Sequence, residues 1–562
     1  MNIMTLDCLL QRCWCHTNLK KFSRRLSVSP HCFRSIVFSL THSFLATMLD
    51  IPELDDMICR QLVLHDLAQC ALVSKKWHTL VIPYIWRDLS WMTQYCTSTK
   101  VRDFFRMVNE DYIAEQQCQD LQGAEQSTQA RSILPLSALS RYGRWIRVLP
   151  DPYQLSNLQE PLLNQFLHYA PDAQVKYFWM AIEYMDSESP QKAIVDFALP
   201  RVQRLRVGVH GTPRSSSISK LMHLLDQPSI ALERLELEVT ISNMIEDEPM
   251  ENEPETCTTL RELVFCQYYP DTDTETFLSM LFRRCGRVEK FQLVECIGPV
   301  DQLSQGMLSY MPDLKEISLG DEGEDDEPDD AAMATLLSGS RHGWKIVRLR
   351  SRLGTEAIDA LLKHTSTLEL LDIRECDGTL SIHLGQLLSS CTNLHTLAWS
   401  LEDHSDSTYC SYIDFKAFID LDPDTGAPKP WRCEASLKEF KVIITGISRS
   451  YLQKGGDGRE VQSRVYDRLA RFTNLETLWL GDAESSYCSR LEMSLASGLG
   501  KLSGFKELRE LSVFGLATRI GIEEAQWMSA NWPRLYVVRG LGDAGACTWF
   551  KENTGVNAQL ER

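Results

Sequence analysis

The sequence contains no run of 18 apolar residues and no excess of basic residues, and each absence excludes a class of protein. A helix needs about 20 consecutive apolar residues to cross a bilayer, so no membrane span is expected. The 58 Lys and Arg residues are outnumbered by 76 Asp and Glu residues, which gives a net charge of −18. A chain with this charge balance has no basic excess to neutralise phosphates. We therefore expect neither a membrane nor a nucleic acid as partner.

The motifs of common catalytic sites are also missing. The segment from Gly498 to Lys501 lacks the first glycine and the spacing of a phosphate-binding P-loop. There is no G-x-S-x-G, H-E-x-x-H or kinase signature, and there are no C-x-x-C pairs of the kind that hold zinc in a RING domain. The 13 histidines are scattered along the chain. An enzyme is the least favoured function, and we predict no catalytic residue and no cofactor.

The 18 cysteines follow no framework of fixed spacings. Scattered cysteines in a long chain suit a reducing compartment, so we expect a cytoplasmic or nuclear protein. Cys8, Cys13, Cys15 and His16 invite a zinc interpretation, but their spacing fits no usual set of zinc ligands. No metal site is predicted.

The sequence does contain a stretch, residues 49–91, that predicts three short amphipathic helices. Pro52 stands at the start of the first helix, where its missing N–H and its fixed φ suit a helix. Leu54, Ile58 and Leu62 follow at i, i+4 and i+8 and form one apolar face. Three helices in about 40 residues are too few to bury this surface alone. Part of it is therefore expected to contact another chain.

The order of residues in this stretch resembles the F-box. The motif positions are filled by Ile51-Pro52, Ile58, Leu62, Asp66-Leu67, Val73 to Trp77, and Trp86. Ile51 and Ser74 stand where the family usually has Leu and Cys. In that family the module binds the Skp adaptor of a cullin–RING ubiquitin ligase. The resemblance implies adaptor contacts from Ile51, Pro52, Leu54, Ile58, Leu62, Leu67, Val73, Trp77 and Trp86. The alternative is that residues 48–91 are an ordinary three-helix part of a larger core.

The segments on either side of 48–91 differ from it in composition. Residues 1–47 hold six Lys or Arg residues against the single acid Asp7. We interpret them as a disordered arm or as a leader that is absent if translation starts at Met48, and the alternative is a mitochondrial presequence. Residues 92–140 suggest one helix followed by a Gln-rich polar run without apolar periodicity. We predict a linker helix and a polar tether there.

From residue 143 onward the chain repeats a short motif of the form L-x-x-L-x-L. Twelve copies begin at residues 202, 232, 260, 288, 314, 344, 368, 394, 437, 475, 508 and 535. The early spacing of 24 to 30 residues is the leucine-rich-repeat period, with one strand and one helix in each unit. Helices are expected over 331–337, 355–364 and 380–390. This predicts an α/β solenoid over residues 141–545, with parallel strands on the concave face, helices outside, and a tail over 546–562. The alternative is the ordinary core of an α/β domain.

Insertions interrupt the repeats. Residues 246–255 hold six acids and residues 321–330 hold eight. Such runs are usually solvated loops, and recognition of a basic partner is the alternative. Residues 402–436 and 445–460 break the period with Pro, Gly and Asp, as binding elements or as relics.

Alternation along each strand predicts which side chains face a partner. In the repeat at 232, Leu235 and Leu237 point to the core, and the residues between them face out. Exposed aromatic residues and arginine are enriched among binding anchors. Counted this way, the predicted substrate-binding residues on the concave face are Arg204, Arg206, Glu236, Glu238, Arg348, Arg350, Arg374, Trp479 and Phe514. The alternative for Trp479 is cover by its own neighbouring loop, residues 445–460.

An F-box followed by a linker and leucine-rich repeats resembles the F-box/leucine-rich-repeat substrate receptors, and the phrase KKWHTLVIPYIWRDL resembles large fungal families of them. The resemblance implies that residues 48–91 bind the Skp adaptor and, through it, the cullin and RING subunits. The repeats would hold an unknown protein substrate, and the chain would contribute proximity but no bond chemistry. The rival function is a non-catalytic interaction scaffold whose F-box serves assembly or its own turnover.

Overall fold

The structure is a computed structural model of the 562-residue chain. It describes residues 59, 67, 70–71, 75–89, 143–149, 170, 172–185, 192–211, 215–226, 231–241, 256–269, 274–296, 300–322, 330–376, 381–398, 412–421, 428–447, 457–481, 491–516 and 520–560. The predicted leader 1–47, the linker 92–140, the first acidic run and most of the second lie outside these residues. The chain divides into unit 1 (Met1–Arg206, Ser229–Leu232) and unit 2 (Val207–Pro228, Glu233–Arg562).

Among the described residues, fifteen strands form one sheet whose order follows the chain, which confirms the predicted α/β fold with parallel strands. The strands are β1 (Val148–Leu149), β2 (Gln174–Ala181), β3 (Val202–Gly211), β4 (Arg234–Ile241), β5 (Glu262–Tyr269), β6 (Lys290–Cys296), β7 (Glu316–Glu322), β8 (Ile346–Leu353), β9 (Leu370–Cys376), β10 (Thr396–Ala398), β12 (Glu439–Lys441), β14 (Thr477–Trp479), β15 (Glu510–Ser512), β16 (Val537–Leu541) and β17 (Asn557–Leu560). From β4 to β16 each strand of this sheet begins two residues after the start of a predicted motif.

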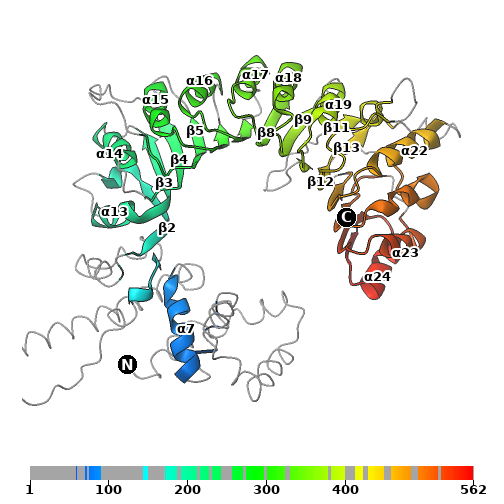
Figure 1. Cartoon of the computed structure of the whole chain (residues 1–562), viewed down its shortest axis with the longest axis horizontal. Helices are drawn as coiled ribbons and strands as arrows, with labels where there is room; N and C mark the ends of the chain where they lie inside the picture. Colours follow the sequence, from blue (N-terminus) through cyan, green and yellow to red (C-terminus); the bar gives the residue numbers. More distant parts are fainter. Residues whose placement is uncertain are drawn as a thin grey trace, which may run out of the picture. The chain divides into compact units, whose positions relative to one another are not determined.

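In unit 2 the helices lie on the outer side and the strands line the inner side (Figure 1). The helices are α14 (Ser215–Leu225), α15 (Thr274–Arg284), α16 (Val300–Tyr310), α17 (Asp330–Ser338), α18 (Thr355–Leu361), α19 (Ser381–Ser390), α20 (Phe415–Ile419), α22 (Asp457–Leu469), α23 (Ile522–Asn531) and α24 (Ala544–Asn553). Short 3₁₀ turns are η4 (Leu362–His364), η5 (Leu495–Ser497) and η6 (Leu499–Gly504). The three helices predicted at 331–337, 355–364 and 380–390 are confirmed, the second of them as α18 followed by η4.

The side chains that face the helices form one apolar column across the sheet of unit 2. The register joins Leu235 to Leu263 and continues through Phe291, Ile317, Val347, Leu371, Leu397, Phe440, Leu478, Leu511 and Val538. None of these side chains is more than 4% exposed. Burial of each stabilises the fold by about 1.5–3 kcal/mol. Each repeat needs its neighbours to complete this column, which explains why the motif recurs.

A buried turn precedes many strands of unit 2. The carbonyl of Cys285 accepts a hydrogen bond from Val288 N at 2.9 Å, and that of Phe472 accepts from Leu475 N at 3.2 Å. Cys433 and Trp532 hold the same position ahead of Leu437 and Leu535. The side chains at this position are buried. Each turn reverses the chain from the helix row into the next strand, so a large or sulfur-containing side chain recurs three or four residues before the motif.

Three features depart from the repeat pattern. Strand β2 forms without an L-x-x-L-x-L motif, and the sheet continues past residue 545 through α24 and β17. Within the insertion 402–436, β11 (Tyr412–Asp414) pairs in parallel with β13 (Ile443–Thr445) in a separate two-stranded sheet. The Asp414 side chain accepts a hydrogen bond from Lys416 N at 2.9 Å and caps α20. The described part of this insertion is therefore folded.

A buried arginine attaches this insertion to α22. The Arg468 side chain is 0% exposed, and its guanidinium lies 4.7 Å from the ring of Trp431. It donates to Glu434 Oε1 at 2.8 Å and to the carbonyl of Phe418 at 3.0 Å. A buried charge is tolerated only when it is paired and hydrogen-bonded, and Arg468 meets both conditions. The chain can therefore depart from the repeat period at this insertion while its apolar core stays packed.

Candidate functional site

The described part of the F-box-like stretch is dominated by helix α7 (Lys75–Arg87) in unit 1. Val81, Ile82 and Ile85 lie on one face of α7 and are buried. Among the predicted adaptor residues, Leu67 is 6% exposed and Trp86 is 5% exposed, so both contact this chain's own core. The α7 backbone includes Trp77. The others, Ile51, Pro52, Leu54, Ile58, Leu62 and Val73, lie outside the described residues, and the adaptor contacts stay a prediction.

The end of α7 is hydrogen-bonded to the first strand of the sheet. Arg147 N donates to the carbonyl of Arg87 at 2.8 Å, and Leu89 N donates to the carbonyl of Val148 at 2.9 Å. Lys176 on β2 forms an ion pair with Asp88. Each backbone bond contributes about 0.5–1.5 kcal/mol net. Positions 89 and 148 therefore meet directly, although the predicted linker 92–140 lies between them in the sequence.

The described residues of unit 1 also include further short helices and two of the predicted substrate residues. The helices are η1 (Gly143–Trp145), η2 (Ile182–Met185) and α13 (Lys192–Ala198), with η3 (Leu199–Arg201) leading into β3. On β3, Arg204 is exposed and Arg206 is partly buried. Tyr177 on β2 is 40% exposed. It was not among the predicted residues, because β2 contains no repeat motif.

On strands β4 to β7 of unit 2 the outward side chains form an ion-pair ladder. Arg234 pairs with Glu236 at 2.7 Å and with Glu262 at 2.8 Å. Lys290 lies 3.5 Å from Glu262 and 3.8 Å from Glu316. The alternation of outward charges with buried Leu235 and Leu237 confirms the predicted strand faces. Because charges of opposite sign neutralise one another along this ladder, it presents little net charge to a partner.

The remaining predicted residues of this region fall into two groups. Glu238 lies 3.8 Å from the His210 ring, so it belongs to an acid–histidine pair. Arg348 on β8 is half-buried, and the register places it beside Asp372 on β9. The backbones of Arg350 and Arg374 lie in β8 and β9. The structure therefore brings the Arg348 and Asp372 positions together, and Glu238 is separate from them.

On strands β12 to β16 the outward residues surround Trp479. The register aligns Lys441, Trp479, Ser512 and Arg539 on successive strands. Lys441 Nζ lies 4.8 Å and Arg539 Cζ 5.3 Å from the centroid of the Trp479 ring. Since Ser512 is small and only 2% exposed, the ring extends over it towards Arg539. Trp479 is thus half-buried against side chains from neighbouring strands, and its cation contacts are the kind that stabilise by about 0.5–1 kcal/mol each.

A carboxylate fixes the orientation of this cluster. Glu510 accepts the indole N–H of Trp479 at 3.2 Å and an Arg539 N–H at 3.1 Å. Phe514, which follows β15, is half-buried. The alternative of cover by residues 445–460 is only partly visible, because residues 448–456 lie outside the described part. The role of Trp479 and Phe514 as binding anchors stays a prediction.

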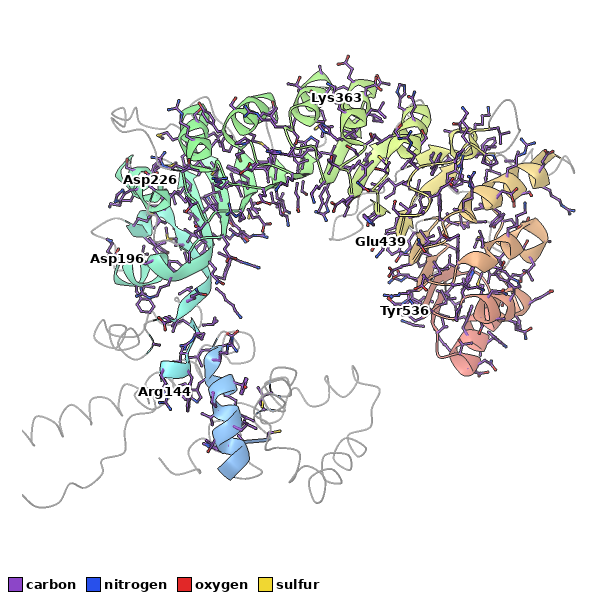
Figure 2. All side chains as sticks on the ribbon, viewed as in Figure 1. Arg144, Asp196, Asp226, Lys363, Glu439 and Tyr536 are labelled. Atoms are coloured by element: carbon purple, nitrogen blue, oxygen red, sulfur yellow. The ribbon has the colours of Figure 1, made fainter. Side chains whose placement is uncertain are left out.

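This surface also includes residues that the prediction from outward strand positions did not name. Tyr536, one residue before β16, is 56% exposed, and Figure 2 shows it on the strand-lined inner side together with Glu439. In the same view Lys363 projects from the outer side. Glu476 lies 3.3 Å from Arg509 and 3.6 Å from Lys438. The sequence signal for these residues is their position directly after the first leucine of each motif. An exposed side chain at that position borders the outward face of the strand.

The described residues offer few features of a catalytic centre. Within them no group of three or more His, Cys, Asp or Glu side chains is placed to bind a metal ion. Burial raises the pKa of the Cys391 and Cys433 thiols to about 12, so both are protonated and poor nucleophiles at neutral pH. His364 is buried, and its ring bonds the carbonyl of Leu337 at 2.8 Å. In the described part of the chain no helix is long and apolar enough to span a bilayer.

Comparison with known proteins gives one family match. Residues 53–90 match the model of the F-box-like family, so this segment is an F-box-like domain. The chain therefore combines an F-box-like domain with a solenoid-like α/β fold whose long parallel sheet is consistent with a leucine-rich-repeat type of fold. No curated protein matches the sequence. Among solved structures, a chain of the Rad7–Elc1 complex from yeast shares 12% identity at a TM-score of 0.36, over 76% of this chain and 86% of that chain. A likeness at this TM-score supports no functional statement.

Proposed function

We propose that this chain is the substrate-recognition subunit of a Skp–cullin–F-box ubiquitin ligase. The observation that carries the proposal is the F-box-like match at residues 53–90. The same segment runs into α7, whose end is hydrogen-bonded to β1 of the sheet. In this proposal the F-box-like domain binds the Skp adaptor, and the cullin and RING subunits follow through it. The inner face of the strands binds a protein substrate in the cytoplasm or the nucleus.

The contribution of the chain to the reaction is proximity. Holding a substrate beside a ubiquitin-loaded conjugating enzyme raises the effective concentration of the reacting groups. This role needs no catalytic side chain, cofactor or metal in the chain itself. Within unit 1, the hydrogen bonds of Arg87 and Leu89 to residues 147 and 148 attach the F-box-like segment to β1.

The test is co-purification of the full chain from cells under proteasome inhibition. We expect the Skp adaptor and a cullin to be recovered together. A variant with Leu54→Ala and Trp77→Ala should lose both, because these residues hold apolar positions of the F-box motif. Recovery of the adaptor and cullin at equal yield with this variant would contradict the proposal.

The second candidate is a non-catalytic interaction scaffold whose F-box-like domain serves assembly or the chain's own turnover. It is favoured by the mixed aromatic and charged inner face, which suits a partner whether or not that partner is ubiquitinated. Recovery of the adaptor without a cullin would support the scaffold. Partners that accumulate under proteasome inhibition only when the F-box segment is intact would support the receptor.

A further inference from the structure

The inner face of strands β12 to β16 carries exposed cations next to aromatic side chains, in a chain whose net charge is −18. It consists of Lys438, Arg509, Arg539, Trp479 and Tyr536, with Glu476 and Glu510 as internal counter-ions; we call these residues the Trp479 surface. All of them lie in unit 2, and their strands are consecutive in the sheet.

The cations of the Trp479 surface are more exposed than the carboxylates that pair with them. The Lys438 and Arg509 side chains are 55% and 48% exposed, whereas Glu476 between them is 30% exposed. Arg539 is 33% exposed and its partner Glu510 is 16% exposed. An approaching molecule therefore meets positive charge first, although the surface as a whole is nearly neutral. One pair on the same face runs the other way, since Glu439 is 40% and Lys441 22% exposed.

The aromatic residues define a second requirement. The Tyr536 side chain is 56% exposed beside Arg509, whose carbonyl accepts the Tyr536 N–H at 2.9 Å. Trp479 is held in one orientation by Glu510 and by two cations, so little side-chain entropy is lost when a ligand packs on it. Rigid aromatic rings next to arginine are the composition of binding hot spots.

We propose that the Trp479 surface binds an acidic peptide segment that carries an aromatic or aliphatic side chain next to its carboxylates. The proposal rests on the proposed function in that the segment belongs to the protein substrate. The carboxylates of the segment pair with Lys438, Arg509 and Arg539, and its apolar side chain packs on Tyr536 and the edge of Trp479. A nucleic acid fits less well, because its phosphates are spaced continuously and would meet Glu439, Glu476 and Glu510.

Two kinds of variant test the proposal in opposite directions. Arg539→Gln and Arg509→Gln each remove a cation and should weaken binding of an acidic peptide by about tenfold. Glu476→Gln removes the carboxylate that competes for Lys438 and Arg509, so it should tighten binding by about threefold. Lys363→Gln changes an exposed cation on the outer side and serves as the matched control.

The probe is a displayed library of random peptides, selected on the full-length chain. We expect wild-type selections to be enriched in sequences that combine Asp or Glu with an aromatic or aliphatic residue. Titration of the best peptide against each variant should show the two losses, the gain for Glu476→Gln, no change for Lys363→Gln, and weaker binding as salt rises. Equal melting temperatures of the variants exclude misfolding as the cause.

Several outcomes would overturn the proposal. Enrichment of basic or uncharged peptides, or equal weakening by Lys363→Gln, would contradict it. Binding of a single-stranded oligonucleotide in place of peptides would assign the surface to nucleic acid. Self-association that Arg539→Gln abolishes, without peptide capture, would assign it to a second copy of the chain.

The same preparations separate this proposal from the proposed function. Adaptor capture depends on residues 53–90, and peptide capture depends on the Trp479 surface. Loss of adaptor capture with intact peptide binding would refute the ligase role alone. Intact adaptor capture without acidic-peptide binding would refute the surface assignment alone.

Discussion

Replacing Arg468 with methionine should loosen the insertion between β10 and α22. The substitution keeps an unbranched side chain of similar reach but removes every hydrogen bond of the guanidinium. The carbonyls of Phe418, Ile419 and Lys429 lose a donor, and Glu434 keeps Arg471 as its ion-pair partner and the N–H of Trp431 as a donor. The Arg468 side chain is 0% exposed, so water does not replace these bonds without local opening.

The expected loss of stability follows from this geometry. Removing one partner of a buried ion pair typically lowers the free energy of unfolding by 3–5 kcal/mol. Arg471 stays 2.9 Å from Glu434 and offsets part of the loss, so we expect about 3 kcal/mol for Arg468→Met. Because a solenoid is held by nearest-neighbour contacts, the effect should be local to residues 412–447.

Hydrogen exchange measured by mass spectrometry is the appropriate assay, since it resolves segments. Arg468→Met should speed exchange in β11, α20 and β13 and leave β4 to β8 unchanged. The matched control is Arg464→Met on the same helix, where an exposed i,i+4 pair with Glu460 is worth less than about 0.5 kcal/mol. If both variants exchange alike, Arg468 does not hold the insertion, and the reasoning from its buried bonds is wrong.

Three further outcomes are expected. Trp479→Ala should weaken binding of acidic peptides by roughly 2 kcal/mol. It should lower the free energy of unfolding by no more than about 3 kcal/mol, since it removes one hydrogen bond and two cation contacts. A large drop in the melting temperature with intact peptide binding would show that Trp479 is a core residue only. Burial lowers the pKa of His364 in the folded chain, so the unfolded chain binds a proton more readily. The stabilising effect of the neutral His364 should therefore be complete above the unfolded pKa of about 6.5 and decrease as the pH falls below that value. His364→Gln should flatten this pH dependence in thermal melts between neutral and mildly acidic pH. Leu89→Pro deletes the N–H that donates to the carbonyl of Val148. Hydrogen exchange in residues 143–149 should therefore speed up, while exchange in β12 to β16 stays constant. An unchanged exchange rate in 143–149 would show that other contacts hold α7 to β1.

The strands of unit 2 were predictable because the leucine motif is a direct consequence of the apolar column. Leu235, Leu263 and Leu371 must align for each repeat to bury its neighbour, and a near-constant period over the early repeats makes this alignment visible in the sequence. The turn residues Cys285, Cys433 and Trp532 were less visible, because the position tolerates any large buried side chain. Chemical variety at this structural position hides the turn from a search of the sequence for one residue type.

The candidate site was predictable only in part. Alternation along β14 correctly places Trp479 on the outward face. Its contact with Arg539 joins strands β14 and β16, across the small Ser512, and the sequence separation of these residues carries no information on that contact. The meeting of Leu89 with Val148 was also hidden, since a polar segment of the linker type lies between them. Contacts between distant segments decide both features.

The central claim is that the F-box-like domain binds a Skp adaptor, and a mass measurement of the purified complex tests it most directly. The full chain mixed with a purified Skp adaptor should give a species with the mass of one copy of each. The variant with Leu54→Ala and Trp77→Ala should stay free while its circular dichroism and melting temperature match the wild type. Absence of the complex with the wild-type chain, or an equally stable complex with the variant, would contradict the account.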